Sequence, residues 1–325
     1  MPQDSAKVIL IPRFFYGWYM VAIAYLSLFL TASASTTLSV LIPTMSADLG
    51  WSVSTLVGAS SIGVAIGAVI GPWIGRLVDQ RGPRLLMAVS IFTLGLVCAQ
   101  TGAVTEPWQL YLGFGVIGGI CRTGSMYIGP GALLANWFLR KRATASGFAA
   151  LGPPSCSIVI PAFTTMTMAA FGWRGSWFVY GAVCMLLFAP PVALFVRHRP
   201  EALGLLPDGA AAPITMPGSG QPPSGAAPED DWTLRETLRS RGFWLLAVSM
   251  ALIGLLPNTI FVLHFSTFKA QGLPESVAAG CVAVSGLPQV VSRIFVWTPL
   301  VGRLGVRRGL FAWSGLILVG GLLWA

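Results

Sequence analysis

Two arginines, Arg122 and Arg293, lie deep inside apolar stretches of this 325-residue sequence. A guanidinium group holds a carboxylate through two parallel hydrogen bonds and stays protonated at any accessible pH. An ionisable side chain at membrane depth costs roughly 3 kcal/mol or more, so by default it marks a functional site. All eleven acidic residues fall in loops or at the ends of the apolar stretches. The chemistry that this pattern predicts is the binding of a small organic anion.

Tyr127 is a further candidate, because it follows Arg122 by five residues and its hydroxyl could donate to the same anion. A purely structural role is the alternative for each residue. Arg122 would then bond backbone carbonyls where two helices touch, and Arg293 would extend its head toward the lipid headgroups. Tyr127 would then only pack against its neighbours.

The elements that carry these residues are predicted to be transmembrane helices. The chain is 55% hydrophobic and only 10% charged, with a mean hydropathy of +0.75, whereas a soluble domain carries about 25% charged residues. Lipid offers the backbone no hydrogen-bond partners, so apolar spans become helices. The apolar runs predict nine helices, at about 17–43, 54–77, 84–104, 107–137, 143–171, 174–196, 242–265, 275–301 and 308–325. We therefore expect an all-α membrane protein.

The net charge of +9 reflects topology and predicts no nucleic-acid partner. Positive loops stay on the cytoplasmic side of a membrane protein. With a cytoplasmic amino terminus, Arg174 and Lys269 face the opposite side, and 16 of the 20 basic residues are cytoplasmic: Lys7, Arg13, Arg76, Arg81, Arg84, Arg140, Lys141, Arg142, Arg197, Arg199, Arg235, Arg239, Arg241, Arg303, Arg307 and Arg308. We expect a multi-pass protein of the plasma (inner) membrane.

The sequence offers no pattern for an enzyme, a metal site or a cofactor. Its five cysteines lie in apolar spans without a CxxC spacing, so we interpret them as buried thiols. Paired carboxylates at depth, HExxH, GxSxG and phosphate-cradling loops are absent from the sequence. We expect a non-enzymatic protein without a cofactor.

A repeat divides the chain. The run "PWIGRL" at 72–77 returns as "PLVGRL" at 299–304, an offset of 299 − 72 = 227. The run "YGWYM" near residue 17 has its counterpart in "RGFWLL", at offsets of 225 and 226. Two separate matches at nearly one offset indicate a duplicated unit of about 225 residues.

The first copy lies in a short charged loop, "GPWIGRLVDQRGPRLL", between the second and third predicted helices. A tight turn there needs residues that allow close approach, Gly75 and Gly82, and a helix stop, Pro83. Asp79 can pair with neighbouring arginines or face a helix amino terminus. The second copy lacks about four residues, including the aspartate.

Gly75, Leu77, Asp79, Gly82 and Arg84 resemble the loop signature of the major facilitator superfamily, G-x-L-x-D-[RK]-x-G-[RK]-[RK]. In that family the loop pins two halves together on the cytoplasmic side. The chain departs from the pattern with glutamine and proline where the family favours basic residues, and this puts the strength of the pinning in doubt. The runs "FYGWYMV", "NWFLRKRATASG", "FGWRGSWF", "RPEALGLLPDG" and "LRETLRSRGFWLLA" further resemble the bacterial monocarboxylate-transporter and oxalate:formate-antiporter-like branch.

The resemblance implies a bundle of six plus six helices. We expect a six-helix half at 1–196, a cytoplasmic linker at 197–241 and an incomplete second half at 242–325, with a short surface helix after Thr233. Since nine helices are predicted where twelve are needed, we expect a truncated form. A protein that is complete with nine helices is the alternative.

The resemblance also assigns residues. The branch places a carboxylate-binding arginine in helix 8, and Arg293 matches that position. One turn earlier, animal monocarboxylate transporters carry an aspartate tied to proton coupling, and Gln289 occupies that position here. Glutamine cannot take up a proton, so proton symport through this position is in doubt.

The function implied is secondary transport of small organic anions, monocarboxylates or related carboxylates, by alternating access of a monomer in the bilayer. Two alternatives remain at this point. One is a drug or sugar carrier of the same superfamily. The other is a non-transporting sensor or an inert fragment.

Overall fold

The computed structural model describes residues 15–209 and 234–249, with the single positions 284, 291, 308, 315 and 316. The chain divides into two compact units, and residues 15–209 belong to the first. The described residues are helical and contain no strand. This all-α architecture is the one that the apolar runs predicted.

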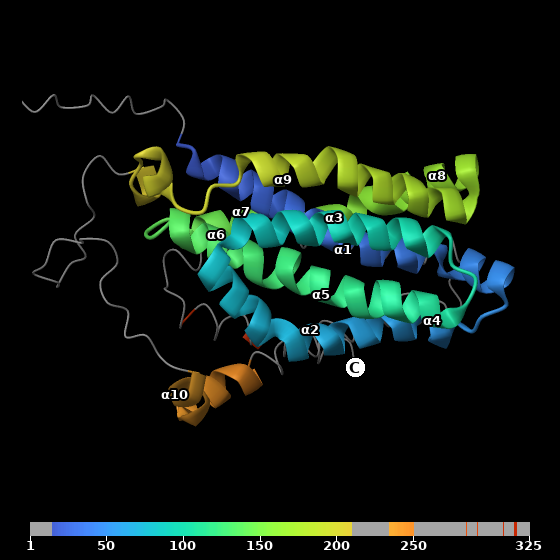
Figure 1. The fold of residues 1–325 in the computed structure, drawn as a ribbon, viewed down its shortest axis with the longest axis horizontal. Helices are drawn as coiled ribbons and strands as arrows, with labels where there is room; N and C mark the ends of the chain where they lie inside the picture. Colours follow the sequence, from blue (N-terminus) through green and yellow to red (C-terminus); the bar gives the residue numbers. More distant parts are fainter. Residues whose placement is uncertain are drawn as a thin grey trace, which may run out of the picture. The chain divides into compact units, whose positions relative to one another are not determined.

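The first unit is a bundle of helices that lie side by side along one direction (Figure 1). Three π-helical segments, η1 to η3, interrupt the α-helices after α4. In a π-helix each backbone hydrogen bond spans five residues. The elements are α1 (Gly17–Leu49), α2 (Val53–Arg81), α3 (Pro83–Gly102), α4 (Pro107–Leu110), η1 (Tyr111–Ile117), α5 (Gly118–Arg122), η2 (Thr123–Ile128), α6 (Gly129–Trp137), α7 (Arg142–Ala149), α8 (Gly152–Ala182), η3 (Val183–Phe188), α9 (Ala189–Phe195), and two 3₁₀ turns, η4 (Pro200–Leu203) and η5 (Pro207–Gly209). The continuous stretch 107–137 is called helix 4 below.

The helix α8 contains a reversal of the chain at Gly172, whose φ of 70° and ψ of 177° are not helical. Contacts along α1 record the path up and back: Gly152 lies against Tyr25, Thr164 against Thr37, Trp173 against Asp48, Tyr180 against Ser33 and Phe195 against Tyr16. The stretch 142–171 is therefore one pass, called helix 5, and 173–195 is the next, called helix 6.

Four described helices are long and apolar enough to cross a membrane: 17–49, 53–81, 83–102 and 142–195. The last has 54 residues. At about 1.5 Å per residue it would far exceed a bilayer core of about 30 Å, so the reversal at Gly172 makes it two crossings. The observed helices agree with the predicted spans to within a few residues at most ends, and α1 continues six residues beyond residue 43.

Small residues bring α2 and helix 4 close together. A Cβ on Gly115 would lie 3.1 Å from the carbonyl oxygen of Ala59, and one on Gly119 would lie 2.5 Å from that of Gly63. Four residues further on, a Cβ on Gly67 would lie 2.5 Å from the Thr123 hydroxyl. Small residues repeating every four positions on both helices are the usual means of close packing in membranes. This contact places helix 4 directly beside α2.

Two side chains from other helices hold the end of α9. The last carbonyls of a helix lack partners within it. Arg84 Nε donates to the Ala193 carbonyl at 2.7 Å, and the Tyr16 hydroxyl donates to the Phe195 carbonyl at 2.8 Å. A cation at this helix end is also favoured by the helix dipole.

The segment that follows α9 is held by helix 4. Trp137 Nε1 donates to the Arg197 carbonyl at 2.9 Å, and Asn136 Nδ2 donates to the His198 carbonyl at 3.2 Å. The runs around residues 16 and 137, which support the branch resemblance, and the loop signature around residue 84 therefore meet at one end of the bundle. We call it the basic end, because the loops with Arg76 to Arg84, Arg140 to Arg142 and Arg197 to Arg199 lie there.

Asp208 binds the loop between helices 4 and 5. Its carboxylate accepts from three successive backbone N–H groups, those of Leu139 at 3.1 Å, Arg140 at 2.7 Å and Lys141 at 3.1 Å. Asp208 adopts φ of 59°, a left-handed conformation that is uncommon for residues other than glycine. The chain thus stays attached to the first unit through Gly209.

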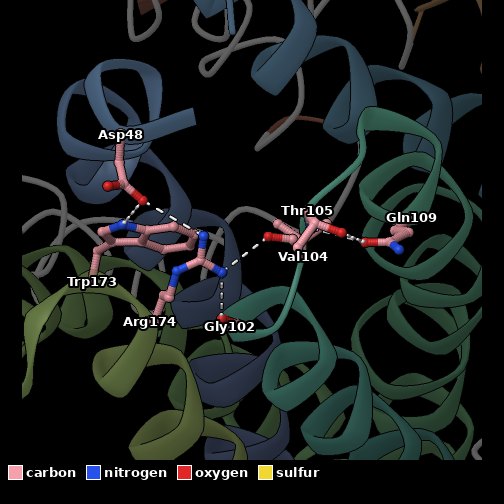
Figure 2. A network of polar contacts seen from close by, with 7 residues as sticks. All are labelled: Asp48, Gly102, Val104, Thr105, Gln109, Trp173 and Arg174. Carbon is pink, nitrogen blue, oxygen red and sulfur yellow. Dashed lines mark hydrogen bonds and ion pairs between the residues drawn. The ribbon is translucent and has the colours of Figure 1, made fainter. Parts of the chain in front are cut away.

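At the far end of the bundle, Arg174 ties three helices together (Figure 2). Its Nη1 donates to the carbonyl of Gly102, the last residue of α3, at 3.4 Å and to that of Val104, in the loop that follows, at 3.0 Å. Its guanidinium stacks on the Trp173 ring at 4.4 Å and lies 3.6 Å from Asp48 Oδ2, which also accepts from Trp173 Nε1 at 3.1 Å. Trp173 and Arg174 of the run "FGWRGSWF" therefore join this end of the bundle through their side-chain contacts.

We expect Arg174→Gln to lower the melting temperature by a few degrees, since about 1–2 kcal/mol resides in the carbonyl bonds and the ring stacking. The ion pair itself contributes little, because its side chains are 41% and 52% exposed. Asp48→Asn, which keeps an acceptor for Trp173, should therefore cost less than Arg174→Gln. Thermal unfolding in detergent measures both, and equal losses would assign the stability to the ion pair instead.

In the second unit the structure describes residues 234–249. The short helix predicted before the span 242–265 is present as α10 (Leu234–Arg239), while Thr233, its predicted cap, lies outside the described residues. Residues 241–249 are helical, at the start of the predicted span 242–265. The predicted spans 275–301 and 308–325 also lie outside the described residues, apart from single positions.

Candidate functional site

Arg122 lies in the middle of helix 4 and is only 8% exposed. Its Nη1 donates to the Ser35 hydroxyl of α1 at 3.2 Å, and its Nη2 donates to the Phe114 carbonyl of its own helix at 3.2 Å. A guanidinium carries five N–H groups. Three of them have no hydrogen-bond partner among the described residues, so the group has capacity for a ligand.

The surroundings of the guanidinium are an aromatic ring and a glycine. The Phe114 ring centroid lies 4.9 Å from Arg122 Cζ, which is within the range of a cation–π contact. A Cβ on Gly63 of α2 would overlap Nη2. The absence of a side chain at Gly63 is therefore what allows the Arg122 head to lie between α2 and helix 4.

The charge of Arg122 has no carboxylate partner among residues 15–209 and 234–249. The ion pair recorded in these ranges joins Arg174 to Asp48 at the far end. A buried charge without a counter-ion is costly in an apolar environment. The carbonyl bond to Phe114 supplies part of the structural role that the sequence left open, but it leaves the net charge uncompensated.

Tyr127 lies one helical turn beyond Arg122, because the intervening residues are π-helical. In η2 (Thr123–Ile128) the backbone repeats about every five residues, as the bond from Gly129 N–H to the Gly124 carbonyl shows. Tyr127 is 67% exposed, and no hydrogen bond joins it to Arg122. The five-residue spacing therefore places Tyr127 one turn along the helix, where its hydroxyl and the Arg122 guanidinium are close enough to interact electrostatically. Its role as a donor to the anion stays a prediction.

Two of the π-helical segments come just before prolines. Pro130 follows η2, and Pro190 follows η3. Proline lacks the N–H that would donate to the carbonyl four residues earlier, so the preceding turn relaxes to wider spacing. Single π turns are frequent at functional sites. In helix 4 the two π segments flank α5, the short element that ends at Arg122.

The residues of the charged loop lie at the basic end. Gly82 has a φ of 78° and links α2 to α3, whose first residue is Pro83. Arg84 holds the end of α9, as described above. A Cβ on Gly75 would meet no atom within 4 Å, so the close approach expected there is not made by the described residues. Asp79 is exposed and has no polar partner among them.

His198 packs on the loop glycine. A Cβ on Gly82 would lie 2.8 Å from His198 Nδ1, and this nitrogen is buried without a hydrogen-bond partner among the described residues. Burial lowers the pKa of His198 below its usual 6.5, nearby Arg199 lowers it further, and Glu201 opposes the shift. The neutral imidazole is thus the form that fits the folded protein.

We expect thermal stability to fall as the pH drops below about 6.5. The pKa of His198 is lower in the folded state than in the unfolded state, so the unfolded state binds the extra proton first. This contribution to stability is present above pH 6.5 and is lost as the pH falls toward the folded pKa. Melting curves from pH 7.5 to 5 should show a shallower slope for His198→Gln. His264→Gln, at the other histidine of the chain, is the control, and an equal effect there would remove His198 from this role.

Several predicted residues lie outside the described ranges. These are Arg293, Gln289 and Cys281. The remaining four cysteines, Cys98, Cys121, Cys156 and Cys184, are free and buried, as expected for thiols that act as small apolar groups. The described residues contain no cluster of acidic, histidine and cysteine side chains that could hold a metal.

Comparison with known protein families identifies the family of the chain. The family model described as "Major Facilitator Superfamily" matches residues 24–325. The chain belongs to the major facilitator superfamily. Members of this superfamily are built from helical halves related by an axis along the membrane normal. The first unit would correspond to one such half under the predicted division of the chain, which stays a prediction, as does the role of the loop at 75–84.

Curated relatives of the chain carry transporter names. Monocarboxylate transporter 4 of Rattus norvegicus is 25% identical over 289 residues, which are 86% of this chain and 56% of the relative. Monocarboxylate transporter 11 of Homo sapiens is 25% identical over 324 residues, 94% and 63% respectively. Riboflavin transporter RibJ of Trypanosoma cruzi is 32% identical over 145 residues, 43% and 30%. The chain spans less than two thirds of the length of each of these relatives.

The residues that sequence reasoning missed act through contacts between helices. Ser35 and Phe114 were hidden in apolar spans, and only the fold brings them to Arg122. Asp208 is part of the run "RPEALGLLPDG". Nothing in the sequence predicted that its carboxylate would accept hydrogen bonds from the backbone of residues 139–141. The Pro-Asp-Gly order was the available signal, since it favours a turn with an outward carboxylate.

Proposed function

We propose that the protein is a secondary transporter of small organic anions, monocarboxylates or related carboxylates, that works by alternating access. The observation that carries this is the buried Arg122 guanidinium, which has spare N–H donors and no carboxylate partner among the described residues. The names of several relatives as monocarboxylate transporters support the same substrate class.

The remaining assignments belong to the same proposal. Arg293 would supply the second cation at the midplane, with Gln289 one turn earlier in place of a proton-carrying aspartate. The basic end with its loop would face the cytoplasm, with the amino terminus on that side of the plasma (inner) membrane, since basic loops favour it. The loop with Gly75, Asp79, Gly82 and Arg84 would pin the two halves together in one conformation, as the resemblance to the superfamily implies, and the protein would act as a monomer.

The test is uptake into proteoliposomes that contain the purified protein. We expect radiolabelled pyruvate, lactate or oxalate to accumulate, and excess unlabelled carboxylate to compete. A lipophilic cation should not compete, because a cationic site repels it. Competition by the cation, by riboflavin or by a neutral sugar, with no effect of carboxylates, would instead assign the protein to the drug or sugar carriers of the superfamily.

A second line of the test concerns coupling. With a glutamine at position 289, the proposal predicts exchange or facilitated diffusion through this position rather than proton symport. Uptake measured with and without an inward proton gradient checks this. A strict requirement for the gradient would place the proton route on other residues.

A further inference from the structure

The hydroxyl of Ser35 differs from those of its neighbours on α1. Thr31 donates to the Ser27 carbonyl at 2.7 Å, Ser33 to the Leu30 carbonyl at 2.8 Å and Thr36 to the Ala32 carbonyl at 3.2 Å. Such back-bonding to the helix is the usual way for a serine or threonine to satisfy its proton in a membrane helix.

Ser35 instead accepts a hydrogen bond from Arg122 Nη1 at 3.2 Å and donates to none of the described residues. A hydroxyl has one donor and two acceptor sites. The proton of Ser35 therefore remains available beside a guanidinium that itself has three N–H groups to spare.

Both groups meet at an open surface of the first unit. Ser35 is exposed, while the Arg122 side chain reaches it from the interior and is 8% exposed. Ser39 lies one turn further along the same face of α1, is also exposed, and has no hydrogen-bond partner among the described residues. A ligand that approaches Ser35 thus meets the end of a buried cation and a free hydroxyl proton side by side.

We propose that Ser35 is a direct ligand of the substrate carboxylate and that it forms one subsite with Arg122. One carboxylate oxygen accepts from the guanidinium, and the other accepts from the Ser35 hydroxyl. The hydroxyl oxygen keeps its bond from Nη1, so the two donors are held in a fixed relation before the anion arrives. This inference rests on the proposed function, and it names a binding residue that the apolar surroundings of Ser35 conceal in the sequence.

The first test compares variants in binding and uptake of radiolabelled pyruvate, lactate and oxalate by the purified protein. Ser35→Ala should raise Kd and KM about tenfold with little change in the maximal rate, as expected when a donor to a charged group is lost. Ser35→Thr, which keeps the hydroxyl, should stay within about threefold of the unchanged protein. Ser39→Ala, a matched exposed serine on the same face, should have no effect.

A second measurement separates a ligand from a residue that only orients Arg122. In an Arg122→Lys background, equilibrium binding of the carboxylate should still weaken about tenfold on Ser35→Ala if Ser35 touches the anion. If Ser35 acts only through the guanidinium, the second substitution should change nothing. That result, or unchanged Kd in the single Ser35→Ala variant, would overturn the proposal.

Different results would rule out the proposed function and the assignment of Ser35. If the unchanged protein neither binds nor transports any carboxylate of the panel, the proposed function fails and this inference fails with it. If the unchanged protein binds carboxylate and Ser35→Ala binds it equally well, the function stands and only the assignment of Ser35 is lost.

Discussion

Arg122→Gln should weaken carboxylate uptake, measured as kcat/KM, by about 30-fold or more. Removing one partner of a desolvated charge pair costs about 2–5 kcal/mol, and each 1.4 kcal/mol is a factor of ten. Glutamine keeps a polar group at this position, while the charge that the proposed anion would meet is lost. Uptake by proteoliposomes, normalised to folded protein, measures the effect.

The controls for this variant separate charge from geometry and from stability. Arg122→Lys keeps the charge without the planar fork and should fall between the two. Arg174→Gln removes an arginine at the far end and should leave KM unchanged. If Arg122 is purely structural, Arg122→Gln will lower the melting temperature and leave KM as it was.

Gly119→Leu is expected to disrupt the bundle. A Cβ there would lie 2.5 Å from the Gly63 carbonyl oxygen and 2.7 Å from its Cα, so α2 and helix 4 must separate. Overpacking of this kind costs roughly 3 kcal/mol, which corresponds to a fall in melting temperature of roughly 10 °C. The loss would come in spite of the better helix propensity of leucine.

Gly131→Leu is the matched control, because Gly131 lies on the same helix and a Cβ there meets no atom within 4 Å. Its melting temperature should stay unchanged or rise slightly. Size-exclusion profiles and thermal unfolding in detergent compare the two variants. Equal behaviour of both would show that the contact of helix 4 with α2 at Gly119 tolerates separation.

Much of the fold could be predicted from local pattern. The ends of the helices follow apolar runs that stop at glycine, proline or charge, and the turn at Gly82 and Pro83 is of this kind. The hairpin at Gly172 lies at the boundary that the sequence predicted between the spans 143–171 and 174–196, where Arg174 was assigned to a loop. Such features depend on composition within a few residues. The helical form of the spans follows from the bilayer, which offers the backbone no hydrogen-bond partners.

The site could be predicted only in part. The burial of Arg122 follows from its depth in an apolar span, but its contacts with Ser35 and Gly63 depend on how three helices pack. The π-helical turn between Arg122 and Tyr127 depends both on Pro130, which follows it in the sequence, and on how helix 4 packs against its neighbours. Sequence periodicity assumes 3.6 residues per turn throughout and therefore does not predict the wider turn between Arg122 and Tyr127.

The burial of the native thiols has a practical consequence for labelling experiments. Cys98, Cys121, Cys156 and Cys184 are enclosed in the helix bundle, and maleimide reagents react with accessible thiolates. After Cys281→Ser, a single cysteine introduced on the exposed face of α1 would be modified selectively, without a cysteine-free background. Fluorophores or spin labels could then follow the proposed alternating access in a nearly native protein.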